Sequence, residues 1–259
     1  MRRRDELAAA LLDNGNGLAA RFLDNGALFG LHAGDIMVNL VLGSPMGGAL
    51  GNLFLRSFDG GAVSWTPLIG PRAAGRFFVA QGTARWVGRW QDIEYDCSFE
   101  LDPVDTAWAW RCRLTDRSGR RRNLDLVLAQ DLGLGLESHV RTNELYTSQY
   151  IDHTVLRDPS LGYVVCSRQN LAQAGAHPWV AHACAGGATG YLTDATQLYG
   201  TASRSTGEPQ ALGHRRLASR RLQHEVAMPV LQARRIRLRE GASEETAFVG
   251  IYRDRKSDV

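Results

Sequence analysis

The chain has almost no lysine, no long apolar run and no clear targeting segment. Lys256 is the only lysine among 30 basic residues, and this arginine bias is typical of a GC-rich genome. No run of 18 apolar residues occurs, which argues against a membrane-spanning helix. The start, MRRRDELAAALLDNG, is basic, but acids interrupt it and its apolar part is too short for a signal peptide. We therefore expect a cytoplasmic protein with no membrane partner.

Metal-ligand spacings are also missing. None of the four cysteines sits in a CxxC pair, so a zinc site of the usual spacing is not indicated. Cys97 and Cys112 fall on the apolar faces of predicted strands, where a free thiol behaves as a small hydrophobic group. We expect reduced thiols and no metal cofactor. Four histidines in the second half of the chain are also not spaced like the ligands of a metal site: His177, His182, His214 and His224.

Charge does not point to a nucleic-acid partner. The net charge is only +3, because 27 acidic residues are spread among the basic ones, and no nucleic-acid-binding motif accompanies them. Eight arginines gather in His214–Glu240. This segment is predicted either as an interface with a further domain or second subunit, or as an edge protected from aggregation.

Period-two alternation dominates the chain and predicts an all-β fold. In Asp92–Leu101 the apolar residues alternate with polar ones, and Thr106–Thr115 repeats the pattern with Trp108 and Trp110 on its apolar face. We expect both tryptophans in the core. The other predicted strands are Leu18–Leu23, Leu28–His32, Asp35–Leu42, Asn52–Phe58, Arg85–Trp90, Asn123–Gln130, Gly162–Cys166, Trp179–Cys184, Gly190–Asp194, Ala233–Leu238 and Ala247–Tyr252.

Many short strands separated by Gly- and Asn-rich turns are typical of a large antiparallel β-sandwich. Only Asp5–Leu12 looks helical. We predict one sandwich domain over residues 15–252, an N-terminal tail or short helix over 1–14, and a loose C-terminal tail over 253–259.

The densest polar cluster lies between Arg141 and Asn170. It combines planar, hydrogen-bonding side chains with aromatic rings, a surface that suits a sugar. The candidate binding residues are Arg141, Asn143, Glu144, Tyr146, Gln149, Tyr150, Asp152, His153, Arg168, Gln169 and Asn170.

Each candidate also has a structural alternative. Asp152 and His153 could work as an acid/base pair, but neighbours in an extended chain point to opposite faces, so hydrogen bonding within the fold is the simpler interpretation. Arg168–Asn170 follow an apolar strand and could either meet a sugar or form a buried polar network.

Aromatic and acidic residues carry similar alternatives. Tyr146, Tyr150 and Trp179 could stack on sugar rings, although aromatic residues on strands are more often core, and we predict core. Four acidic residues could be mistaken for the two catalytic carboxylates of a glycosidase. We predict instead that they cap loops or form salt bridges: Asp131, Glu144, Asp194 and Glu208.

Several segments occur in the order found in one enzyme family. The segments are GDIMVNLVLGSPMGGALGNLFLR (Gly34–Arg56), PLIGP (Pro67–Pro71), LAQDLGLG (Leu128–Gly135), RTNELYTSQYIDHTV (Arg141–Val155), GYVVCSRQN (Gly162–Asn170), GYLTDATQLYG (Gly190–Gly200) and GEPQAL (Gly207–Leu212). Together they resemble the N-terminal domain of glycoside hydrolase family 94 phosphorylases, of the 1,2-β-oligoglucan phosphorylase branch, and are similar to the phosphorylase-like region of cyclic β-1,2-glucan synthases.

The resemblance implies a galactose-mutarotase-like supersandwich, followed in the family by an (α/α)6 barrel. It implies reversible phosphorolysis with inversion, in which inorganic phosphate is a co-substrate, an acid protonates the glycosidic oxygen, and no cofactor takes part. In the family the acid and the phosphate pocket belong to the barrel. We therefore expect this chain to lack them, as a fragment, a truncated product or a sandwich that works with a separate partner.

Three functions follow as hypotheses. The first is a non-catalytic domain that contacts a β-1,2-linked glucooligosaccharide, supports a helical-barrel catalytic domain and forms a homodimer, with Arg141–Asn170 reaching the neighbouring subunit as the resemblance implies. The second is a stand-alone carbohydrate-binding module, which needs two or more of Tyr146, Tyr150 and Trp179 exposed on one surface. The third is a self-sufficient mutarotase or hydrolase, which needs acid and base groups converging in a pocket.

Overall fold

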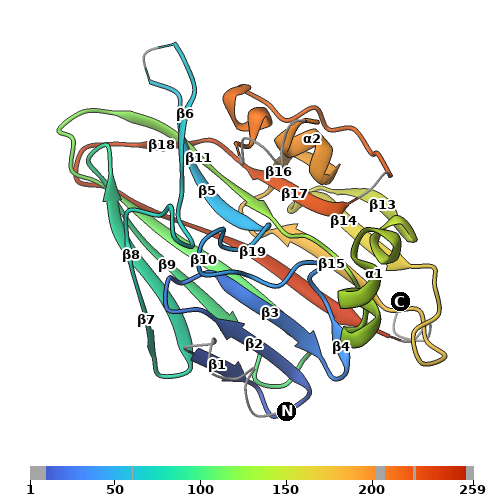
Figure 1. Cartoon of the computed structure of the whole chain (residues 1–259). Coiled ribbons are helices and arrows are strands. Elements are labelled where there is room, and N and C mark those ends of the chain that lie inside the picture. The colour runs from blue at the N-terminus through green and yellow to red at the C-terminus, as the bar shows by residue number, and fades with distance from the viewer. Residues whose placement is uncertain (1–9, 60, 202–207, 224–225, 255–259) are drawn as a thin grey trace.

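The computed structural model describes residues 10–59, 61–201, 208–223 and 226–254. Within these ranges the chain forms two mainly antiparallel β-sheets with little helix, so the predicted all-β sandwich class is confirmed (Figure 1). No helix in this part of the chain is long and apolar enough to cross a membrane.

The smaller sheet has five strands and packs across the larger one. Its strand β2 buries Leu18, Ala20 and Phe22, and the Phe22 ring lies 5.3 Å from Trp86 and 6.3 Å from Trp110, centroid to centroid. In order across the sheet the strands are β1 (Ala10–Asp13), β2 (Leu18–Phe22), β3 (Leu28–Ala33), β4 (Ile36–Met37) and β12 (Gly135–Leu136).

The larger sheet has 14 strands and divides into two halves at β14 (Gly162–Gln169), which also pairs with β13 (Ile151–Asp158). One half continues through β15 (Trp179–Cys184), β19 (Ser243–Arg253), β10 (Ala107–Asp116), β9 (Ile93–Leu101), β8 (Thr83–Trp90) and β7 (Arg76–Ala80). The other half continues through β16 (Ala188–Asp194), β17 (Ala227–Ala233), β11 (Arg122–Ala129), β5 (Asn52–Ser57) and β6 (Ser64–Pro67), with β18 (Ile236–Leu238) beside β11.

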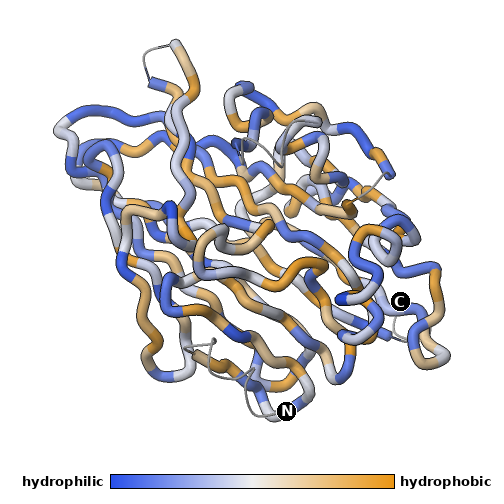
Figure 2. Tube along the Cα trace, in the orientation of Figure 1, coloured by the Kyte–Doolittle hydropathy of each residue, from blue (hydrophilic) through white to orange (hydrophobic). Residues whose placement is uncertain are grey.

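A single core cluster joins the inner faces of both halves and the small sheet. In β9 and β10 every second residue is buried, as the alternation predicts, and Trp108 and Trp110 are 2% and 5% exposed, which confirms them as core. Figure 2 shows apolar stretches along the strands and polar stretches in many of the connecting loops.

The junction between the halves is narrow, and we call it the seam. Only one residue pair, Gly162 with Ala188, joins β14 to β16 in parallel register. Gly162 has φ +68°, and a Cβ there would lie 2.1 Å from the Ala188 carbonyl oxygen. Glycine is required at this position because both the backbone conformation and the close approach exclude a side chain.

Two short helical segments, α2 (Ala195–Tyr199) and η2 (Gln210–Gly213), cover the outer face of the second half. The side chain of Asp194 caps α2 by accepting from the Thr196 amide at 2.8 Å. Their apolar residues pack on the outward residues of β5, β11 and β17. That half of the sheet is therefore buried on both faces.

A buried ion pair lies under this cover. Arg56 donates two bonds of 2.7 Å to the Asp125 carboxylate, and both side chains are fully buried. Arg56 also donates to the carbonyl oxygens of Leu212 (3.2 Å) and His214 (2.7 Å). Burial raises the pKa of the Asp125 carboxyl, and the bonds from Arg56 and Gln232 oppose that rise.

Several sequence predictions were wrong in detail. Ala10–Asp13 forms β1, so the end of the predicted helix Asp5–Leu12 is a strand, because pairing with β2 overrides local helix preference; residues 5–9 lie outside the described ranges. The predicted strand Ala233–Leu238 is split between β17 and β18. Helices α1 (Glu137–Gln149) and α2 were not predicted.

The prediction that all cysteines carry reduced thiols was wrong for one pair. Cys97 and Cys112 are opposite each other in the register of β9 and β10, with Cα atoms 4.1 Å apart, and they form a disulfide. Cys166 and Cys184 are free. The disulfide had no CxxC signal because the two cysteines meet only after the β9–β10 hairpin closes.

Trp108 lies flat over Gly250 of the neighbouring strand, and this contact can be tested. A Cβ at position 250 would lie 2.2 Å from the indole, so Gly250→Ala should destabilise the fold by about 1–3 kcal/mol through overpacking. The measurement is the free energy of unfolding in urea. Gly213→Ala is the matched control, because nothing lies within 4 Å of that Cβ position, and a change within about 0.5 kcal/mol is expected. Equal effects of the two substitutions would contradict the packing argument.

Candidate functional site

The polar cluster identified in the sequence folds into one helix and one hairpin. Residues 137–149 form α1, and β13 and β14 pair antiparallel so that Asp152 lies opposite Arg168 and His153 opposite Ser167. Because side chains alternate across a strand, the hairpin sends half of the cluster outward and half into the core. The structure therefore divides the predicted site into separate groups.

The outward group lines a cleft with a volume of about 840 Å³, which we call the β13–β14 cleft. Of the predicted site residues it contains Asp152, Arg168 and Asn170, all of them exposed. Trp179 and His177 form part of the wall. The cleft thus combines carboxylate, guanidinium and amide groups with an indole, the mixture that hydrogen-bonds and stacks on a sugar.

Two tyrosines at the end of α1 form an exposed aromatic pair. The rings of Tyr146 (50% exposed) and Tyr150 (37% exposed) lie 5.0 Å apart, and their hydroxyls are 2.8 Å apart. The prediction that both belong to the core was therefore wrong. The hydrogen bond with Tyr146 raises the pKa of the Tyr150 hydroxyl. The backbone amide of Asn170 donates to the Tyr150 carbonyl at 3.0 Å, which joins the end of α1 to a residue of the cleft, although neither tyrosine lines the cleft itself.

The remaining members of the set on α1 face solvent and do not line the cleft. Arg141 pairs with Glu137 at 3.4 Å, and the Asn143 amide donates to the His139 carbonyl at 3.0 Å. Glu144 has φ 21° and interrupts the helix. This sparsely populated backbone conformation redirects the last turn, which carries the tyrosine pair and Gln149.

Two predicted site residues are buried instead. Gln169 is inaccessible and donates to the carbonyls of Gly133 (3.1 Å) and Thr147 (3.0 Å), so it ties β14 to α1 and to the chain leading into β12. His153 is 1% exposed, and its Nδ1 lies 2.9 Å from the Ser167 hydroxyl. Gln169 thus follows the buried-network alternative for Arg168–Asn170, and His153 follows the hydrogen-bonding alternative for the Asp152–His153 pair. They cannot contact a ligand in the cleft.

Asp152 and His153 do not form an acid/base pair on one surface. Asp152 points into the cleft while His153 points into the core, as strand alternation predicts. Burial lowers the pKa of His153 to about 4, although the nearby carboxylates of Asp152 and Asp194 oppose the shift. His153 is therefore neutral at physiological pH.

A second buried histidine lies in the same interior. His182 on β15 places Nε2 3.2 Å from the Gln130 side-chain oxygen and stacks edge-on against Trp108. Burial, reinforced by His153, lowers its pKa to about 3. In the described part of the chain no group of three His, Cys, Asp or Glu side chains is placed to hold a metal ion.

The capping and pairing roles predicted for three acids are confirmed. Asp131 accepts from the amides of Leu40 and Val41 at 2.9 Å, Asp194 caps α2, and Glu208 pairs with Arg72. Burial raises the pKa of the Asp131 carboxyl. None of these three acids lies in the cleft.

Sequence reasoning missed other parts of the cleft. Thr154, Leu156 and Cys166 also line it, and Ile151–Asp158 was not predicted as a strand. The signal was present, because Ile151, His153 and Val155 alternate with polar or exposed residues. A mixed face with aspartate and histidine obscured this period-two pattern.

The two buried histidines should make the fold acid-sensitive. Their folded pKa values of about 4 and 3 lie below the unfolded value of 6.5, so only the unfolded chain takes up protons between these limits. Their contribution to stability is complete above the unfolded pKa and is lost as the pH falls from 6.5 toward 4. The wild-type chain should therefore lose about 2 kcal/mol more than His153→Gln between about pH 7 and about pH 5.

The measurement is urea unfolding at the two pH values. His214→Gln is the control, since His214 is exposed, and it should keep the wild-type pH dependence. A His153→Gln variant with an unchanged pH dependence would show that His153 titrates normally in the folded state.

The chain is similar to a known enzyme over most of its length. The chain is 32% identical over 215 residues to a 1,2-β-oligoglucan phosphorylase of Listeria innocua serovar 6a, an alignment that covers 83% of this chain and 19% of that protein. The chain thus spans about one fifth of the length of that relative.

Solved structures share the fold at low sequence identity. A polysaccharide lyase superposes with a TM-score of 0.59 at 12% identity, over 97% of this chain and 34% of that one. A putative aldose 1-epimerase from Escherichia coli K12 superposes with a TM-score of 0.51 at 8% identity, over 95% and 98% of the two chains. These likenesses show the fold alone.

The family follows from the sequence comparison. The profile of the SOGP N-terminal domain matches residues 21–250, which is nearly all of the sandwich. The resemblance drawn from the ordered sequence segments is confirmed by this match and by the Listeria relative. The chain belongs to the SOGP N-terminal domain family.

Proposed function

We propose that this chain is the carbohydrate-binding and assembly domain of an inverting 1,2-β-oligoglucan phosphorylase, with no turnover of its own. Membership of the SOGP N-terminal domain family supports this proposal, and so does the relative of that activity. The observation that carries the sugar-binding part is the exposed Tyr146–Tyr150 pair beside the β13–β14 cleft.

The chemistry would belong to a helical-barrel domain. There, inorganic phosphate would attack the anomeric carbon of a β-1,2-linked glucooligosaccharide while a carboxylic acid protonates the leaving oxygen, which releases α-glucose 1-phosphate with inversion. Phosphate is a co-substrate in this scheme and no cofactor takes part. We further propose a cytoplasmic homodimer, in which the exposed polar face of α1 approaches the neighbouring subunit.

The cleft and the neighbouring tyrosine pair would together hold the sugar through three kinds of contact. Tyr146 and Tyr150 offer flat apolar faces to pyranose C–H groups. Arg168 and Asn170 would donate hydrogen bonds to hydroxyls, and Asp152 would accept them. Since these groups come from a helix end and a rigid hairpin, their spacing is set before a ligand arrives, which lowers the entropic cost of binding.

A stand-alone carbohydrate-binding module is the second candidate. The same tyrosine pair favours it, because this function requires at least two of Tyr146, Tyr150 and Trp179 to be exposed, and the two tyrosines are exposed and in contact. It differs from the first candidate in needing no partner domain. A self-sufficient enzyme has no such support, since Asp152 and His153 face opposite sides of the hairpin.

The proposal predicts saturable binding of β-1,2-glucooligosaccharides to the purified chain. Tyr150→Ala should weaken binding about five- to tenfold, because one stacking face and its hydroxyl contact with Tyr146 are lost. Isothermal titration calorimetry gives the affinities. Phe78→Ala is the matched control, since Phe78 is similarly exposed (41%) on the distant edge strand β7, and it should bind normally.

Turnover is tested in the same preparation. Release of α-glucose 1-phosphate from oligosaccharide and phosphate by the chain alone would overturn the non-catalytic assignment. Sugar binding that Tyr150→Ala and Phe78→Ala weaken equally would remove the cleft from the proposal. Tight binding by the chain alone, without any gain when a barrel domain is present, would favour the stand-alone module.

A further inference from the structure

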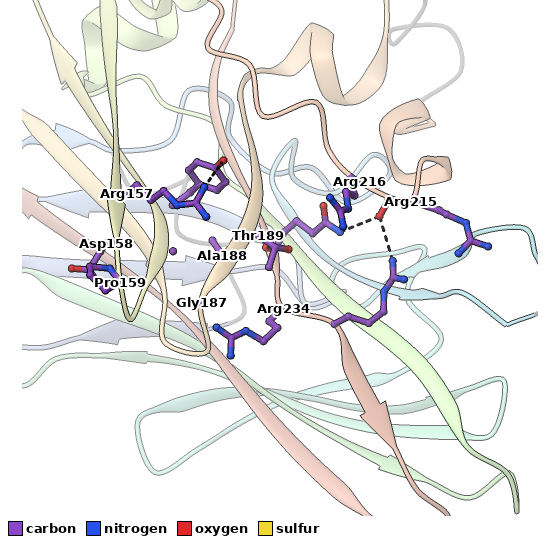
Figure 3. A pocket seen from close by; sticks show the side chains of 13 residues that line it. Arg157, Asp158, Pro159, Gly187, Ala188, Thr189, Arg215, Arg216 and Arg234 are labelled. Carbon is purple, nitrogen blue, oxygen red and sulfur yellow. Dashed lines mark hydrogen bonds between the residues drawn. The ribbon is translucent and has the colours of Figure 1, made fainter.

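A second concave surface, distinct from the β13–β14 cleft, is lined by arginines. It has a volume of about 880 Å³ and lies where the seam meets the loops after β15 and β17. Figure 3 shows these side chains around the opening. We call it the arginine groove and define it by Arg157, Arg215, Arg216, Arg234 and Arg235.

The positive charge of the groove is not balanced by protein carboxylates. Among the described residues, none of the five guanidinium groups has a carboxylate within 4.0 Å. The acidic lining residue, Asp158, instead accepts from the amides of Ser160 and Leu161. On the β8–β9 surface, by contrast, an arginine such as Arg85 pairs with Asp96.

Two of the five guanidinium groups are held against aromatic rings. Arg157 lies 5.1 Å from the centre of the Tyr163 ring and donates to its hydroxyl at 3.2 Å. Arg235 lies 3.8 Å from the centre of the Phe58 ring. Stacking on aromatic rings restricts these long side chains, so an anion would meet donors that are already ordered.

The arginines also repel one another. Burial lowers the pKa of Arg235, and repulsion by Arg215, Arg56 and Arg216 adds to that shift, while Asp125 opposes it. An anion in the groove would relieve this repulsion. Several like charges gathered on one concave surface are a feature of anion-binding sites.

The size and the donor type indicate which anion fits. Small-molecule pockets have volumes of about 300–1,000 Å³, and the arginine groove falls within that range. Arginine forks match the oxygens of a phosphate group in pairs. A nucleic acid would require a basic surface extending beyond the cavity, and the chain as a whole carries a net charge of only +3.

We propose that the arginine groove binds a phosphate group, as inorganic phosphate or as the phosphate monoester of a small sugar. The phosphate would lie between Arg157, from the β13–β14 hairpin, and Arg234, from the loop after β17. It would therefore bridge the two halves of the large sheet at the seam. The proposal is independent of the sugar-binding function of the cleft, which lies on the opposite face of the hairpin.

The test is calorimetric titration of the purified chain at constant ionic strength with inorganic phosphate and with glucose 1-phosphate. Saturable binding is expected, and Arg157→Gln and Arg234→Gln should each weaken it about tenfold, because a charged pair of hydrogen bonds is lost. Arg121→Gln removes the same charge from an exposed turn and should leave the affinity unchanged. Equal affinity for both ligands identifies free phosphate as sufficient, whereas about tenfold tighter binding of glucose 1-phosphate identifies the monoester.

Three results would overturn the proposal. They are no saturable binding of either ligand up to about 10 mM, equal weakening by Arg121→Gln, and binding of a polyglutamate peptide that phosphate does not displace. All substituted side chains are exposed, so the variants should fold, and circular dichroism checks this. Competition between the two ligands on the wild-type chain provides a readout that needs no variant. Failure of phosphate binding would leave oligosaccharide binding at the cleft unaffected.

Discussion

The buried pair of Arg56 and Asp125 is the interaction on which the β5–β11–β17 half of the large sheet and its covering segment depend. It joins β5 to β11, and Gln232 extends it to β17 by donating to the Asp125 carboxylate at 2.8 Å. Gln232 also donates to the Arg215 carbonyl and accepts from the Leu217 amide. The segment that covers this face, and that supplies two arginines of the groove, is thus fixed by one row of buried polar groups.

Such a row is stable only when it is complete. Taking two charges out of water costs several kcal/mol for each ion, and the cost is offset when every donor and acceptor is satisfied. Here the carboxylate and the guanidinium are both bound by several partners from four chain segments. A shift in the register of β5 or β11 would separate these partners. The pair therefore specifies one arrangement of strands and cover.

Features that follow from local sequence patterns were mostly predicted. The alternation in β9 and β10 placed Trp108 and Trp110 in the core, and ordered segments indicated the family. Features made by distant contacts could not be predicted. The burial of Gln169 requires α1 to fold over β14, and the groove requires the fold to bring Arg157 and Arg234 to the same concave surface at the seam. Tyr146 and Tyr150 were wrongly predicted as core residues. Their exposure depends on helix α1, which was not predicted from the sequence.

The β13–β14 hairpin contributes residues to both proposed binding surfaces. One face carries Asp152 and Arg168 in the cleft, and the end of its other face carries Arg157 and Tyr163 in the arginine groove. Besides its pairing with β15, the hairpin is in register with β16 through the Gly162–Ala188 bridge, and Tyr163 packs on Tyr191 of that strand. Any tilt of the hairpin would alter both surfaces together. Ligands at the two surfaces would then be linked thermodynamically, each changing the affinity of the other by the same factor.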